Sequence, residues 1–64
     1  MNLYFADKLK ELRRQKDVSQ EKLARYLNVS FQAVSKWENG NAYPDITLLP
    51  NIARFFGVTT DELL

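Results

Sequence analysis

Apolar residues along this chain recur at helical intervals, and short polar segments separate the recurring groups. Phe5, Leu9 and Leu12 follow one another at spacings of four and three residues. This spacing places their side chains on one side of a helix over about residues 4–16. No stretch of the sequence alternates apolar and polar residues as a half-buried strand would. The pattern therefore predicts an all-α fold.

A second helix is predicted over residues 20–27. Ser19 is a suitable N-cap for it, because its hydroxyl can accept an N–H from the first turn. Asn28 follows the helix, and asparagine adopts the left-handed conformation that closes a helix more readily than most other residues. The inner face of this helix is expected to consist of Leu23, Ala24 and Leu27.

A third helix is predicted over about residues 31–39, with Ser30 as its N-cap and Gly40 as the residue that ends it. At about 100° per residue, its polar side chains fall on one narrow face. These are Gln32, Ser35, Lys36 and Asn39, whereas Ala33, Val34 and Trp37 form the apolar face and Phe31 and Glu38 lie on the flank. Side chains of this polar type can read base edges in a major groove, although an ordinary solvated face gives the same pattern.

The last third of the chain predicts a fourth helix and the beginning of a fifth. Pro50 lacks an N–H and fits only the first turn, so the fourth helix is expected to begin near Leu48 and to end at Gly57. Thr59 and Glu62 form a T-x-x-E capping box that opens the fifth helix. A helix that begins so late suggests the N-terminal part of a longer protein, or an end that frays. The residues expected to be buried in the fourth helix are Leu49, Ile52, Ala53 and Phe56.

Composition excludes several kinds of chemistry. The 64 residues include no cysteine and no histidine, which excludes disulfides, zinc sites built on these residues, thiol nucleophiles and imidazole catalysis. The eight acidic residues show no metal-ligand spacing, and two glycines cannot form a phosphate-binding loop. Neither an apolar run of the roughly 20 residues of a membrane span nor a signal peptide is recognisable. We therefore expect a cytoplasmic protein that is not an enzyme and needs no metal or cofactor.

The net charge of +1 is unevenly distributed. Residues 1–32 contain seven Lys or Arg and four acids, a balance of +3, whereas residues 33–64 contain two and four, a balance of −2. A basic N-terminal half favours a polyanionic partner, although solvated helix faces give the same bias.

Residues 20–38 meet the packing demands of a helix-turn-helix, in which two helices join across a turn of three residues. Ala24 is small where the helices approach, Asn28 permits a left-handed turn, and Val29 and Val34 fill the angle between the helices. In order and spacing, the chain resembles the Cro/cI-type repressor family of helix-turn-helix domains, also called the XRE family. The resemblance covers about residues 5–64, and the matching segments are 18–24, 29–30, 34–40, Pro44 and 57–58.

The resemblance implies a compact five-helix, lambda-repressor-like domain over residues 1–64 that binds double-stranded DNA as a bacterial transcriptional regulator, typically a repressor. The helix over about 31–39 would lie in the major groove, with bases contacted by Phe31, Gln32, Ser35 and Lys36. The DNA backbone would be contacted by Ser19, Gln20, Ser30, Asn39, Asn41 and Tyr43. The family pattern also pairs Arg13 with Glu38 in a structural ion pair.

Two positions depart from the family pattern, and three roles stay open. Asn28 stands where the family prefers glycine, and Phe31 is apolar where polar base-reading residues are common. Phe31 either contacts a thymine methyl or packs on the preceding helix, and Lys36 contacts either a guanine or a phosphate. Tyr43 either contacts the DNA backbone or packs beside Pro44.

Two classes of function fit this sequence. The first is sequence-specific DNA binding to a palindromic operator, with a homodimer in the full-length protein or on DNA and a monomer for the isolated chain. The second is a protein-interaction module, because some members of the family serve as antitoxins or adaptors. A motif enriched from randomised duplexes would distinguish the first from the second.

Overall fold

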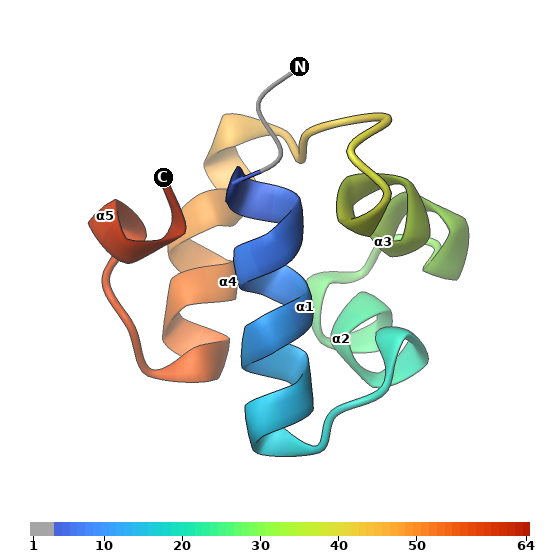
Figure 1. The fold of residues 1–64 in the computed structure, drawn as a ribbon. Helices are drawn as coiled ribbons and strands as arrows, with labels where there is room; N and C mark the ends of the chain where they lie inside the picture. Colours follow the sequence, from blue (N-terminus) through green and yellow to red (C-terminus); the bar gives the residue numbers. More distant parts are fainter. Residues whose placement is uncertain (1–3) are drawn as a thin grey trace.

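The computed structural model describes residues 4–64, in which the other helices surround a central first helix (Figure 1). The helices are α1 (Tyr4–Lys16), α2 (Gln20–Leu27), α3 (Phe31–Glu38), α4 (Leu49–Phe56) and α5 (Thr60–Leu63), and a 3-10 turn, η1, spans Ile46–Leu48. Helices α2 and α3 lie on one side of α1, and α4 and α5 lie on the other. The described residues contain no strand, which confirms the predicted all-α fold.

Each of the five helices contributes one fully buried aliphatic side chain to a shared core. These side chains are Leu9, Leu23, Val34, Ile52 and Leu63, each with 0% of its surface exposed. Burying an aliphatic side chain of this size contributes about 1.5–3 kcal/mol. A domain this small has few such residues, so every helix depends on the others for its burial.

The predicted N-caps are present at the starts of α2 and α3. The Ser19 hydroxyl accepts the N–H of Lys22 at 3.0 Å, and the Ser30 hydroxyl accepts the N–H of Ala33 at 3.1 Å. Each cap bonds an N–H group of the first turn, for which the helix supplies no carbonyl four residues earlier. Both helices therefore begin where the sequence predicted.

Helix α5 is short, yet it is anchored at both ends. The N–H of Glu62 donates to the Thr59 hydroxyl at 3.2 Å, and the N–H of Thr59 donates to the Glu62 carboxylate at 3.3 Å. These two bonds are the predicted capping box. Because Leu63 is fully buried, this end of the chain is packed into the core and is not frayed.

The segment before α4 differs from the prediction. The fourth helix begins at Leu49 with Leu48 as its N-cap, in agreement with the expected start near Leu48, but the unpredicted turn η1 directly precedes it. The reason is Asp45, whose carboxylate accepts the N–H of Thr47 at 3.0 Å and so starts a separate turn. This backbone hydrogen bond holds the pKa of Asp45 below its usual value. Leu49, expected to be buried, is half-buried because it lies at the junction of the two elements.

The described part of the chain measures 26 × 24 × 23 Å along its principal axes. Helix α1 has 13 residues and, at 1.5 Å per residue, is about 20 Å long. It therefore runs through most of the fold. Within residues 4–64, no helix is both long enough and apolar enough to cross a bilayer.

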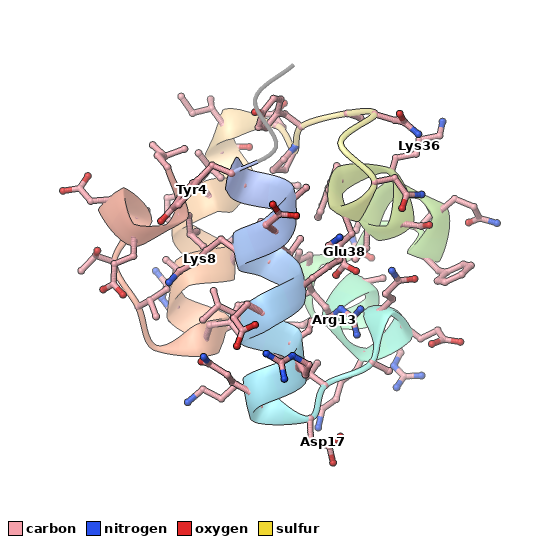
Figure 2. The ribbon with its side chains drawn as sticks, in the orientation of Figure 1. Tyr4, Lys8, Arg13, Asp17, Lys36 and Glu38 are labelled. Carbon is pink, nitrogen blue, oxygen red and sulfur yellow. The ribbon has the colours of Figure 1, made fainter. Side chains whose placement is uncertain are left out.

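Within residues 4–64, two residues other than glycine have left-handed backbones, and one of them predicts a stabilising substitution. Asp17, just after α1, has φ 56°, and Figure 2 shows its side chain pointing away from the fold. Its carboxylate also lies at the C-terminal end of α1, where a negative charge is unfavourable. We expect Asp17→Gly to raise the free energy of unfolding by about 1 kcal/mol, measured by urea denaturation.

The reverse substitution at a matching position is the control. Gly57, after α4, has φ 71°, and an added Cβ would meet no atom within 4 Å. Gly57→Ala therefore introduces backbone strain without a clash and should lower stability by about 1 kcal/mol. A loss of stability in Asp17→Gly would show that a contact of the aspartate stabilises the fold by more than its left-handed backbone destabilises it.

Candidate nucleic-acid interface

Helices α2 and α3 meet across the three residues Asn28, Val29 and Ser30. Asn28 has a left-handed backbone (φ 60°, ψ 44°), and the N–H of Val29 donates to the carbonyl of Ala24 at 3.0 Å. Ala24 is buried, as a position of closest helix approach requires. The structure thus confirms the predicted helix-turn-helix, with asparagine in place of glycine at the turn.

Helix α3 has an apolar inner side and a polar outer side. Val34 and Trp37 are buried in the core. Phe31 is 44% exposed, so the protein covers just over half of it, which leaves both of its expected roles open. Ser35 is half-buried. The outer side carries all the residues expected to face bases, Phe31, Gln32, Ser35 and Lys36, which we call the α3 outer face.

The charge on the α3 outer face is positive. Lys36 is exposed, and Figure 2 shows its side chain extending away from the fold. The acidic residue of α3, Glu38, is buried with 3% of its surface exposed. An approaching phosphate backbone would therefore meet one cation and no carboxylate from this helix.

Glu38 is buried because it is paired with Arg13. The Nε and Nη2 atoms of Arg13 donate to the two carboxylate oxygens of Glu38, the second at 2.8 Å. The Nη1 atom of Arg13 donates to the carbonyl of Val18 at 2.8 Å. The hydrogen bonds to Glu38 raise the pKa of Arg13 above its usual value, so the guanidinium stays charged. The expected ion pair is thus present and joins α1 to the end of α3 (Figure 2).

Gln20 has a partner that the sequence did not indicate. It was expected to contact a DNA phosphate, but its side-chain amide nitrogen donates to Glu38 at 2.9 Å. The side chain is half-buried between the start of α2 and the end of α3. No periodicity connects residues 18 positions apart, and the only signal was a glutamine directly after the N-cap Ser19. The Gln20 amide is thus held by the Arg13–Glu38 pair, and its expected contact with a DNA phosphate stays a prediction.

The other residues expected at the DNA backbone lie near the ends of α2 and α3. Ser19 and Ser30 use their oxygens as N-caps and keep a hydroxyl hydrogen that can still donate. Tyr43 is 52% exposed, and its ring centroid lies 5.8 Å from that of Phe5, so it packs on α1 while part of it remains at the surface. The residues of this group, all exposed, are Ser19, Ser30, Asn39, Asn41 and Tyr43.

The Arg13–Glu38 pair predicts a large loss of stability when it is broken. Arg13→Ala leaves the Glu38 carboxylate buried with only Gln20 as a partner. We expect a loss of about 3 kcal/mol in the free energy of unfolding, measured by urea denaturation. A domain of this size has a total stability of about 3–10 kcal/mol, so the variant should be close to unfolding.

Arg14→Ala is the matched control. Arg14 is the next residue of α1 and also pairs with a glutamate, Glu11, but the two side chains are 75% and 43% exposed. Water already solvates both charges, so this variant should unfold at the same urea concentration as the wild type. Equal effects of the two substitutions would contradict a special role for the buried pair.

A family model described as helix-turn-helix (HTH_3) matches residues 9–63. The match begins within α1 and ends at the last residue of α5. It therefore includes the whole α3 outer face and the Arg13–Glu38 pair.

Several bacterial relatives match nearly the whole chain. The HTH-type transcriptional activator BcrR of Enterococcus faecalis is 52% identical over 60 residues, which are 94% of this chain and 29% of that protein. The SPbeta prophage-derived HTH-type transcriptional regulator YonR of Bacillus subtilis is 38% identical over 60 residues, which are 94% of this chain and 56% of that protein. The chain thus spans less than a third of the first relative and just over half of the second.

A solved structure has the same fold. The restriction-modification controller protein C.AhdI from Aeromonas hydrophila superposes with a TM-score of 0.87 at 27% sequence identity. The superposition covers 97% of this chain and 94% of that protein.

Proposed function

The chain belongs to the helix-turn-helix family, and from that premise we propose that it binds double-stranded DNA with sequence specificity, as the DNA-binding part of a bacterial transcriptional regulator. In this proposal α3 lies in the major groove. The function is one of binding and not of catalysis. The observation that carries the proposal is the α3 outer face, which exposes hydrogen-bonding side chains on a helix held in place by its buried side.

Each residue of the α3 outer face has chemistry that suits a base edge. The amide of Gln32 can donate to and accept from one adenine, and Phe31 can contact a thymine methyl. Ser35 can donate or accept, and Lys36 can reach a guanine or a phosphate. Together they supply both the hydrogen-bonding and the apolar contacts that distinguish base pairs in the major groove.

A second group of residues is proposed to contact the DNA backbone. They lie at the N-terminus of α2, at the N-cap of α3 and just after the C-terminus of α3. The free N–H groups at the start of α2 favour a phosphate. Such contacts set the position of α3 in the groove and carry no sequence information themselves. The residues in this group are Ser19, Gln20, Ser30, Asn39, Asn41 and Tyr43.

The experiment that tests this function is selection of bound DNA from randomised duplexes with the 64-residue chain. We expect a short motif to be enriched. Binding without any enriched motif, or no binding at all, would contradict the proposal and would favour a protein-interaction module.

Gln32→Ala should change the enriched motif. We expect a loss of about 1–3 kcal/mol on the preferred site and a flattened preference at one base position. The side chain is exposed, so the free energy of unfolding should stay within about 0.5 kcal/mol of the wild type. An unchanged motif would mean that Gln32 reads no base.

Lys36→Ala separates the two roles of that lysine. If Lys36 contacts a phosphate, affinity should fall about equally for all duplexes. The slope of the logarithm of the binding constant against the logarithm of the salt concentration should also become shallower by about one. If it contacts a guanine, the preference at one base position should flatten instead. Titrations at several salt concentrations, with both the selected and a random duplex, give the answer.

We also propose that the chain is monomeric alone and binds one half-site weakly. Its net charge of +1 provides little non-specific attraction to DNA. In a palindromic operator, two copies would lie about 34 Å apart, one helical turn of DNA. Analytical ultracentrifugation should give a monomer at micromolar concentration, and a stable dimer there would contradict this.

A further inference from the structure

The Gln20 side chain lies where two parts of the proposed interface meet. It is the first residue of α2, directly after the exposed Ser19, and it reaches the carboxylate at the end of α3. We infer that Gln20 is a positioning residue, which links the phosphate contact at the start of α2 to the carboxylate that holds α3. This inference rests on the proposed DNA binding.

The hydrogen bonds around Glu38 determine how the Gln20 amide points. One carboxylate oxygen, Oε1, accepts from Arg13 Nη2 at 2.8 Å and from Gln20 Nε2 at 2.9 Å. A carboxylate only accepts, so the amide must turn its nitrogen toward Glu38. The nitrogen carries a second hydrogen, and the side chain is only half-buried. That second hydrogen can donate to a phosphate while the first stays on Glu38.

Hydrogen bonds within the protein fix the positions of Arg13 and Glu38. Arg13 is held by α1 and by the carbonyl of Val18, and it holds Glu38 through two hydrogen bonds. Glu38 ends α3, directly after the buried Trp37. A phosphate bound by Gln20 would therefore be fixed relative to α3, and so would the bases that α3 contacts.

This role differs from a plain phosphate contact in one measurable way. A plain contact strengthens binding to every duplex by the same factor, because the phosphates are the same on every base pair. A positioning contact also sets how well α3 fits its preferred bases. Its loss should therefore lower the affinity for the selected duplex more than the affinity for a random one.

Gln20→Met is the test, because methionine has similar length and no N–H. We expect its affinity for the selected duplex to fall about fivefold more than its affinity for a random duplex, both measured by fluorescence anisotropy. Gln15→Met is the matched control. Gln15 also donates its amide to a glutamate, Glu11 at 3.1 Å, but it is exposed on α1 and makes this bond within one helix. The ratio of affinities for the selected and the random duplex should be the same in Gln15→Met as in the wild type.

Gln20→Lys is the rescue variant. A lysine can donate to Glu38 and to a phosphate together, so its discrimination between the two duplexes should return to within about twofold of the wild type. If Gln20→Lys discriminates as poorly as Gln20→Met, the hydrogen bond to Glu38 is not the cause and the inference is wrong. Each variant is compared through the ratio of its affinities for the two duplexes, so a lower stability of Gln20→Met affects both affinities alike.

Two further outcomes separate this inference from the proposed function. If the wild type enriches a motif and Gln20→Met loses the same factor on both duplexes, or loses nothing, DNA binding stands and the positioning role is wrong. If the wild type enriches no motif, the proposed function fails, and the inference fails with it.

Discussion

The buried carboxylate of Glu38 is the constraint on which the arrangement of the first three helices depends. A charge with 3% of its surface exposed must be compensated inside the protein, because an unpaired charge there costs several kcal/mol. Its partners come from α1, through Arg13, and from the start of α2, through Gln20. Such a pair adds little net stability compared with an apolar pair, but it penalises every arrangement in which one partner is missing. The three helices therefore have one favourable relative position.

This constraint leaves the exposed Gln32 and Lys36 of the α3 outer face free of a structural task. An eight-residue helix is not stable alone in water, so α3 depends on its Ser30 cap, on the buried Val34 and Trp37, and on Glu38. All of these lie at its start, its inner side or its end. The exposed glutamine and lysine can then occupy the outer side without weakening the helix. That division of roles is what lets a domain of 64 residues have a rigid and chemically specific surface.

The parts of the structure that sequence reasoning predicted depend on short-range chemistry. Ser19 and Ser30 accept bonds from residues three positions later, and Asn28 closes α2 by its own backbone conformation. The Arg13–Glu38 pair was different, because it followed from the family resemblance and not from spacing. The contact of Gln20 with Glu38 was missed because it depends on how three helices meet in space. The 3-10 turn before α4 was missed because the proline was considered and the turn at Asp45 was not.

In the proposed function, the α3 outer face, oriented by Glu38, lies against DNA. The most direct measurement is an NMR titration of the 15N-labelled chain with the selected duplex. We predict that the amide signals that shift most belong to residues 19–20 and 30–41, at the start of α2 and along α3. Signals from α5 and from the exposed side of α1 should stay in place. Shifts centred on α4 and α5, with those of α3 unchanged, would contradict the account.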